Sequence, residues 1–120
     1  MDEEVDIEII RHGSAAAVAF KSASISNVDR IVVASKQIKD FIDKYRPNRL
    51  VFDFKGVKFF SSQVLGLLLE IRAKLKTYDG EVVISEINPQ LHRVFKITNL
   101  DKIFKFFPDK ESAIKTTDMD

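Results

Sequence analysis

Two adjacent hydroxyls, Ser61 and Ser62, interrupt the apolar stretch of residues 51–70. One hydrophobic run ends at this pair and a second begins after it, so the serines lie where a strand is predicted to lead into a helix. One serine is enough to cap a helix, and such a cap contributes roughly 0.5–2 kcal/mol. The second hydroxyl suggests a functional side chain, because functional loops collect at the strand ends of α/β sheets.

The structural explanation of the pair is that one serine caps the helix and the other is a small turn residue. Two features of the following helix favour a binding role. The helix is unusually apolar, so it is either buried almost all round or offers an apolar patch to a partner. Gly66, one turn into the helix, costs about 0.5–1 kcal/mol relative to alanine. We therefore expect another segment, of this chain or of a partner, to approach Gly66 closely.

The fold would tolerate a phosphate on a serine at this junction. The phosphate would bring roughly −1.5 to −2 charges to the positive end of the helix dipole, where anions bind well. A partner docked over the same apolar surface would be repelled. Such a modification can switch binding without unfolding the domain.

Other residues whose side chains could take part in catalysis or metal binding form no recognisable pattern. Asp53 lies in a predicted strand, without a second carboxylate at a suggestive spacing. His12 and His92 are far apart in the sequence and lack metal-ligand spacing, which predicts surface roles. The glycines match no phosphate-binding loop, and no serine lies in a GxSxG elbow. We expect no cofactor, no metal and no enzymatic activity.

Composition predicts one cytoplasmic domain over residues 1–120. The chain is 45% hydrophobic and has no cysteine, which favours a compact core and excludes disulfides and thiolate metal sites. The formal net charge of +1 argues against binding to nucleic acid or to a charged membrane surface. The acidic N-terminus does not resemble a signal peptide, and no apolar stretch approaches the roughly 18 residues of a membrane span.

Hydrophobic periodicity predicts an initial β-hairpin followed by alternating helices and strands. We expect strands at residues 5–10, 15–20, 49–54, 81–85 and 102–107. We expect helices from Ser26 or Asn27 to Arg46, from Ser61 or Ser62 to just before Gly80, from Asn88-Pro89 onward, and for a turn or two within 108–115. A polar C-terminal tail follows. This order predicts an α/β fold with a mixed sheet of four to five strands and about four helices packed on it.

Two segments of the chain resemble one known family. The first, Phe60-Ser61-Ser62-Gln63-Val64-Leu65-Gly66, follows a strand and a turn and opens an apolar helix. The second runs from Asn88-Pro89 to Phe104 and carries the more specific pattern. Together they resemble the STAS domain, in particular that of bacterial anti-sigma factor antagonists, over about residues 5–115. The resemblance implies the STAS fold.

The resemblance also implies a partner-switching phosphoprotein. In this family a serine at the start of the second helix is phosphorylated by a serine kinase of the histidine-kinase-like ATPase type, which is also the anti-sigma factor. A PP2C-type phosphatase removes the phosphate. The unphosphorylated antagonist binds the kinase and so releases the sigma factor. Counted back from Leu65-Gly66, the phosphorylated position falls on Ser62. We expect a monomer or weak dimer.

The chain departs from the family pattern next to Ser62. Ser61 takes the place of the usual aspartate, and Gln63-Val64 takes the place of the usual Ser-Gly. The missing aspartate removes a charge that a kinase can recognise and leaves Ser61 as an alternative acceptor. The implied partner surface combines the loop before the first helix, the serine junction and the exposed side of the second helix. Its candidate residues are Ser24, Ser26, Asn27, Phe59, Phe60, Ser61, Gln63, Val64, Gly66 and Leu67.

Three alternatives stay open at this point, one of which is an enzyme or a nucleotide-binding domain. The chain can be a structural STAS module of a larger signalling assembly, without phosphorylation. It can also be a partner switch that controls an output other than a sigma factor, such as secretion, biofilm formation or a cyclase. Modification of Ser62 distinguishes the switch from the structural module.

Overall fold

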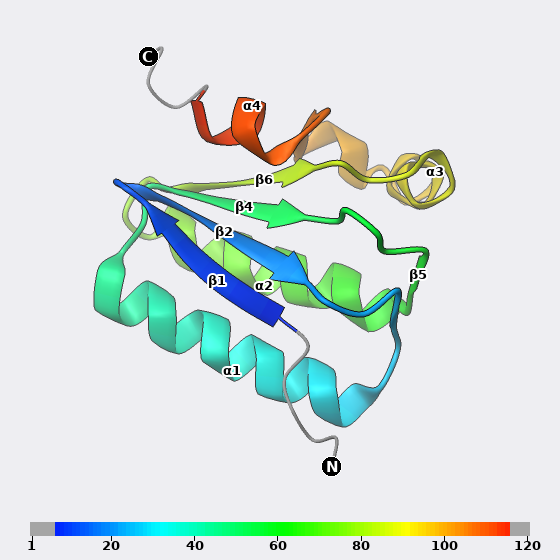
Figure 1. Ribbon diagram of the computed structural model, residues 1–120, viewed down its shortest axis with the longest axis horizontal. Helices are drawn as coiled ribbons and strands as arrows, with labels where there is room; N and C mark the ends of the chain where they lie inside the picture. Colours follow the sequence, from blue (N-terminus) through cyan, green and yellow to red (C-terminus); the bar gives the residue numbers. More distant parts are fainter. Residues whose placement is uncertain (1–6, 116–120) are drawn as a thin grey trace.

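The computed structural model describes residues 7–115 (Figure 1). Its elements, in chain order, are β1 (Ile7–His12), β2 (Ala15–Phe20), β3 (Ser24–Ile25), α1 (Val28–Tyr45), β4 (Arg49–Asp53), β5 (Phe59–Phe60), α2 (Ser62–Lys76), β6 (Glu81–Ser85), α3 (Pro89–Ile97), the 3₁₀ helix η1 (Leu100–Lys102), β7 (Lys105–Phe107) and α4 (Lys110–Lys115).

The main sheet is mixed and has five strands in the order β1-β2-β4-β6-β7. β1 and β2 form the predicted antiparallel hairpin, and the remaining neighbours are parallel. Each parallel neighbour follows a helical crossover, as the alternation of patterns predicts. The predicted class, a mixed sheet with an initial hairpin and four helices, is confirmed.

Both faces of the sheet are covered. α1 and α2 lie on one face and α4 lies on the other (Figure 1). Because side chains alternate along a strand, Leu50 and Phe52 of β4 enter the large core beneath α1 and α2, whereas Val51 packs with Ala113 of α4. Strand β4 is therefore buried along its whole length.

The helix ends follow the predicted local signals. Asn27 caps α1, its side-chain oxygen accepting from the Arg30 amide at 3.1 Å. α1 ends before Arg46, whose φ of 43° terminates the helix ahead of Pro47. Asn88 caps α3 by accepting from the Leu91 amide at 2.9 Å, with proline at the first helical position.

The structure differs from the expected elements in two short strands and at several element boundaries. The short strands β3 and β5 were not predicted, and β4 ends at Asp53 rather than at residue 54. The last strand begins at Lys105 rather than at residue 102, because residues 100–104 form a helical turn after Asn99, which adopts φ 64°. The first strand continues to His12. The start of the expected strand, residues 5 and 6, and the polar tail, residues 116–120, lie outside the described residues.

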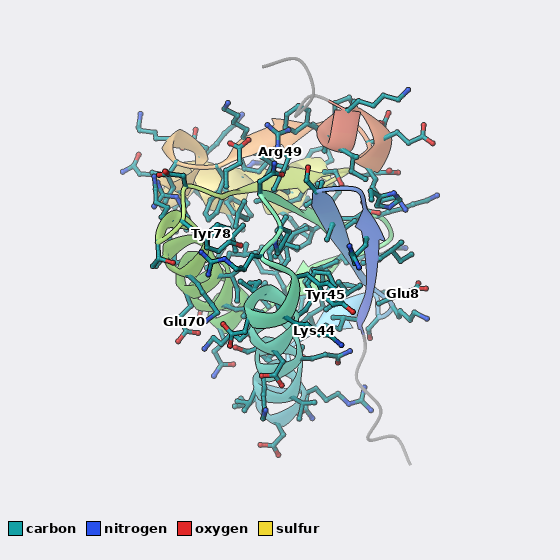
Figure 2. The ribbon with its side chains drawn as sticks, turned by 90° about the vertical axis from the view of Figure 1, so that its left-hand side faces the viewer. Glu8, Lys44, Tyr45, Arg49, Glu70 and Tyr78 are labelled. Atoms are coloured by element: carbon teal, nitrogen blue, oxygen red, sulfur yellow. The ribbon has the colours of Figure 1, made fainter. Side chains whose placement is uncertain are left out.

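α4 is attached to the sheet by a buried arginine. Arg49 is only 2% exposed and lies between the amino ends of the strands and α4 (Figure 2). Its Nη1 donates to the carbonyl oxygen of Ala113 at 2.7 Å, and its Nη2 pairs with Glu81. The guanidinium also lies over the Phe107 ring at 5.7 Å from the centroid. Arg49 therefore joins β4, β6, β7 and α4.

Within residues 7–115, no helix is long and apolar enough to cross a membrane.

Candidate partner-binding site

A second, two-stranded sheet joins the loop before α1 to the serine junction. β3 and β5 pair in parallel, Ser24 opposite Phe59 and Ile25 opposite Phe60. The Lys58 amide donates to the Ala23 carbonyl at 2.8 Å and the Ser61 amide donates to the Ile25 carbonyl at 3.0 Å. The two loops named in the sequence prediction are thus adjacent, beyond the carboxyl ends of β2 and β4 (Figure 1).

The serine junction is also held by contacts with the protein core and with α3. Phe60 is buried and packs edge-on against Phe54 and Phe95, with ring centroids 5.6 and 6.1 Å apart. The side-chain amide of Asn88 donates to the Val57 carbonyl at 3.0 Å, so the N-cap of α3 also holds the loop between β4 and β5. Because these contacts come from α3, from its N-cap and from the residue that follows β4, and β3 pairs with the same segment, the junction has a defined position.

Ser61 occupies the N-cap position of α2, with extended backbone angles of φ −83° and ψ 165°. The expected hydroxyl cap is absent, and that expectation is wrong for both serines. The Ser61 hydroxyl donates to Oε1 of Gln63 at 3.3 Å instead of accepting from a first-turn amide, and Ser62 already belongs to the helix. The Ser61 carbonyl oxygen does accept from the Val64 amide at 3.0 Å.

Ser62 is the first residue of α2, and it is exposed. The side chain of the N-cap residue, Ser61, makes no capping hydrogen bond, and the first turn of α2 carries no acidic residue. The free amides of a helix N-terminus and the positive end of the helix dipole both favour an anion. A phosphate on Ser62 would lie at this end of the helix.

The candidate residues divide into exposed and buried groups. Phe59 is 52% exposed on β5, and Ser24, Ser26, Asn27, Gln63 and Gly66 are also exposed. Phe60, Val64 and Leu67 are buried, at 6%, 0% and 4% exposed. Their side chains support the surface from inside, so an approaching partner would meet mainly the exposed group.

A groove runs between α1 and α2 beside this junction. Its volume is about 780 Å³, and its lining residues are Ile31, Val32, Ser35, Lys36, Lys39, Asp40, Gln63, Gly66, Leu67 and Glu70. Val32 is 60% exposed and Val28, one turn earlier, is 51% exposed, so α1 presents an apolar stripe toward the serine end of the groove. We refer to this feature as the α1–α2 groove.

Gly66 lies in the α1–α2 groove without internal crowding. A Cβ atom at this position would have no heavy atom within 4 Å. No other segment among residues 7–115 therefore needs the space that glycine leaves, and the expected close approach from within this chain is wrong. The other half of the expectation, a close approach to Gly66 by a partner, stays a prediction.

Two ion pairs connect α1 and α2 across the groove. Lys39 of α1 pairs with Glu70 of α2 at 3.2 Å, and Lys74 of α2 pairs with Asp43 of α1 at 2.8 Å. These pairs are partly exposed and each contributes only about 0–1 kcal/mol. Their position limits the open, apolar part of the groove to the end nearest Ser62.

The other candidates of the sequence do not line the α1–α2 groove. Asp53 accepts a hydrogen bond from the Ser85 hydroxyl at 3.0 Å and from the Lys55 amide at 3.3 Å, which is a structural role at the strand end. His12 is exposed at the hairpin, and His92 packs on Phe106 with ring centroids 4.2 Å apart. Among residues 7–115, no three His, Asp or Glu side chains gather as a metal site would require.

Sequence reasoning did not identify Val28 and Val32 as surface residues. Both match the apolar spacing of an amphipathic helix, so the sequence pattern places them with the core. The signal that distinguishes them is angular: α1 buries Ile31, Ala34, Ile38 and Ile42, and Val28 and Val32 lie to one side of that stripe.

Comparisons with known proteins agree with this architecture. The family model described as STAS domain matches residues 14–113. The anti-sigma F factor antagonist of Paenibacillus polymyxa is 24% identical over 78 residues, which are 65% of this chain and 67% of that protein. The unphosphorylated anti-sigma factor antagonist SpoIIAA superposes with a TM-score of 0.83 at 15% identity, covering 95% of this chain and 97% of that one. The Bacillus cell fate determinant SpoIIAA in its phosphorylated form gives 0.73 at 17% identity, covering 92% and 98%.

Proposed function

The chain belongs to the STAS domain family, and we propose that it is an anti-sigma factor antagonist whose binding is switched at Ser62. In the unphosphorylated state it binds an anti-sigma factor that is also a serine kinase of the histidine-kinase-like ATPase type. Phosphorylation of Ser62 releases the complex, and a PP2C-type phosphatase restores binding. The role is one of binding rather than catalysis, and it would be carried out in the cytoplasm, where sigma factors act.

The exposure of Ser62 at the start of α2 is the observation that carries this proposal. Ser62 follows exposed Phe59 of β5 by three residues and directly precedes Gln63, which lines the α1–α2 groove. A partner that buries Phe59 and fills the groove would cover Ser62 as well. Aromatic side chains at the centre of an interface commonly supply a large share of the binding energy.

Electrostatics supplies the switch. A phosphate would add roughly −1.5 to −2 charges next to free amides at a helix N-terminus, which favours the modified fold. The same charge would have to lose its water when a partner docks over it, and an unpaired charge buried at an interface is costly. The modification is therefore expected to weaken binding without unfolding the domain.

Ser61 stands at the position where the family usually has an aspartate, and its polar groups are already engaged within the chain. It is half-buried, its amide is engaged with Ile25, and its hydroxyl is engaged with Gln63. Ser62 has no side-chain hydrogen bond to another described residue and is the more accessible acceptor. We therefore assign the modification to Ser62 rather than to Ser61.

The first test is to map phosphate by mass spectrometry on the protein purified from its native cells. We expect phosphate on Ser62 that disappears in Ser62→Ala and persists in the matched control Ser61→Ala. Phosphate on Ser61 would contradict the assignment. Absence of phosphate from both serines under several growth conditions would favour the structural module over the switch.

The second test measures partner binding. The kinase partner is first isolated from the native cells with the wild-type chain as bait. Ser62→Ala should keep the fold and bind this kinase with wild-type affinity. Ser62→Asp should bind at least tenfold more weakly, because it places a charge at the docked surface. Isothermal titration calorimetry with the purified kinase gives both affinities, and Ser61→Asp serves as the control for a charge one residue away. Equal affinity of Ser62→Asp and wild type would rule out an electrostatic switch. If the partner, on binding the wild-type chain, releases something other than a sigma factor, the switch controls a different output.

A further inference from the structure

A second pocket lies at the end of α2 opposite to Ser62. Its volume is about 110 Å³, and it is lined by Arg72, Lys76, Gly80, Glu81, Val82, Ile103 and Lys105. That volume is several times what a single water molecule needs. At 1.5 Å per residue, Arg72 and Lys76 lie about 15–21 Å further along the helix axis than Ser62, so the pocket is separate from the proposed switch surface.

The pocket has an excess of positive charge. Arg72, Lys76 and Lys105 line it, and none of the three forms an ion pair or side-chain hydrogen bond with another residue in the range 7–115. Glu81 is the one carboxylate in the lining, and Arg49 already pairs with it. The charge of Glu81 is thus largely offset, and the three cations face the pocket without a counter-charge.

Helix electrostatics accounts for only two of these cations. Basic residues near a helix C-terminus complement its dipole, and this explains Arg72 and Lys76 on α2. It does not explain Lys105, which comes from β7 and meets the helix residues across the pocket. Like charges brought together by separate elements repel one another, and a bound anion removes that repulsion.

We propose that this pocket binds the phosphate group of a small molecule, through Arg72, Lys76 and Lys105. A guanidinium presents two parallel donors that match phosphate oxygens, and the two ammonium groups add point charges. A phosphate carries enough charge to balance the excess, and its few atoms suit a pocket of this size. This site does not depend on the proposed function, because none of its residues belongs to the α1–α2 groove or the serine junction.

Binding there would connect α2 to the edge of the sheet. The ligand would bridge the last turns of α2 and the first residue of β7, so it would stabilise the folded state by mass action. A rise in melting temperature with phosphate concentration at constant ionic strength is the expected global readout.

The test is a titration of the ¹⁵N-labelled full chain with inorganic phosphate, followed by NMR at constant ionic strength. We expect saturable shifts of the amides of Gly80, Glu81 and Lys105. Arg72→Gln should weaken binding at least tenfold, and Lys76→Gln and Lys105→Gln severalfold each. Lys96→Gln removes one exposed charge from α3 outside the pocket, and it should change the affinity by less than twofold.

The outcomes separate the sources of the phosphate. A second titration uses adenosine monophosphate: tighter binding than inorganic phosphate identifies a phosphate ester as the ligand, and equal binding identifies the phosphate group alone. The proposal is overturned if chloride at matched ionic strength gives the same shifts, if no titration saturates, or if Lys96→Gln weakens binding as much as Arg72→Gln. Binding of a polyglutamate peptide without binding of phosphate also overturns it. Lys76 and Lys105 are exposed, so their variants test the site even if Arg72→Gln fails to fold.

Discussion

Ser62 is exposed at the first position of α2, whereas the neighbouring Ser61 is half-buried and its hydroxyl is bonded to Gln63. A kinase has to reach the acceptor oxygen from several sides, so accessibility separates two residues that are chemically identical. The difference arises from β3, because the Ser61 amide is held by the Ile25 carbonyl at 3.0 Å. This backbone hydrogen bond holds Ser61 in place, whereas exposed Ser62 is the acceptor that we propose.

Gly66→Ala should stabilise the fold and weaken partner binding. A Cβ would meet no heavy atom within 4 Å, so the alanine should add about 0.5–1 kcal/mol to the free energy of unfolding through better helix propensity. A partner seated in the α1–α2 groove would meet the added methyl group. Urea unfolding and calorimetry with the kinase measure the two effects.

The control for this variant is Ala73→Gly, at an exposed position of α2 outside the groove. It should lower stability by a similar amount and leave partner affinity unchanged. Destabilisation by Gly66→Ala would mean that the fold itself requires glycine there.

Tyr78 should make the fold sensitive to alkaline pH. Burial raises the pKa of Tyr78 above its ordinary value of 10.0, and nearby Arg46 opposes the shift only in part. Its hydroxyl donates to the Pro47 carbonyl at 2.8 Å (Figure 2). Because the folded-state pKa is raised, the associated stability is complete below pH 10 and is lost as the pH rises through the folded-state pKa.

The chain has two tyrosines, so Tyr45→Phe leaves Tyr78 as the only phenol to follow by ultraviolet titration. We expect the Tyr78 phenolate to form with a midpoint above 10.0 in the folded protein. A midpoint at or below that of the urea-unfolded chain would be incompatible with the burial argument.

At the scale of elements, the short pair β3–β5 organises the candidate site. Each strand has two residues, and an isolated pair of this length is unstable in water. It persists here because Phe60 is buried against Phe54 and Phe95, and because Asn88 holds the same loop. The loops before α1 and α2 are therefore positioned by α3, which lies outside the proposed contact surface.

Asn88 variants test this connection. Asn88→Ala loses both the N-cap of α3 and the bond to the Val57 carbonyl, and should lower the free energy of unfolding by about 1–3 kcal/mol. Asn88→Asp keeps the capping oxygen and loses only the donor, so its loss should be smaller. Chemical denaturation measures both, and hydrogen exchange at Phe59 and Ser61 reports on β5.

The comparison variant is Asn27→Ala, which removes a cap and no second bond to a loop. It should cost about 0.5–2 kcal/mol and leave exchange at α3 unchanged. Equal exchange at Phe59 in Asn88→Asp and in wild type would show that the Asn88 donor does not hold the loop.

At the scale of the whole molecule, the two faces of the sheet differ in how they are covered. The face under α1 and α2 carries most of the core, whereas the other face carries a small cluster of Ala17, Val51, Val83 and Ala113 under α4. A helix of six residues has little stability of its own. We therefore expect the Arg49 bond to the Ala113 carbonyl, with the guanidinium held in turn by Glu81, to help keep α4 on the sheet.

Arg49→Ala should destabilise the whole fold by about 2–4 kcal/mol, because it leaves the Ala113 carbonyl without its donor and creates a cavity beside Phe107. Arg49→Lys should recover part of this loss, and the exposed control Arg93→Ala should stay within about 0.5 kcal/mol of wild type. Urea unfolding gives the totals, and hydrogen exchange should show Ala113 and Ile114 opening first. If the α4 amides exchange no faster in Arg49→Ala than in wild type, Arg49 does not hold α4 on the sheet.

Local sequence patterns predict the hairpin, the alternation of strands and helices, the cap at Asn88 and, to within one residue, the cap of α1, which is Asn27 rather than Ser26. These features depend on residues a few positions apart, so periodicity and capping chemistry predict them. The change of hydrophobic period also placed the serine pair at the start of α2, whereas the choice of Ser62 as the proposed acceptor came from the family resemblance.

Which candidate residues are accessible to a partner follows from long-range contacts and could not be predicted from local patterns. The tertiary structure paired β3 with β5, buried Phe60, Val64 and Leu67, and brought Lys105 to Arg72. Two-residue strands and cations more than thirty positions apart leave no local pattern, because their contacts form only after the chain has folded back on itself. The same reason applies to Gly66: the sequence shows an unfavourable residue, and the space around it is set by two helices that are distant along the chain.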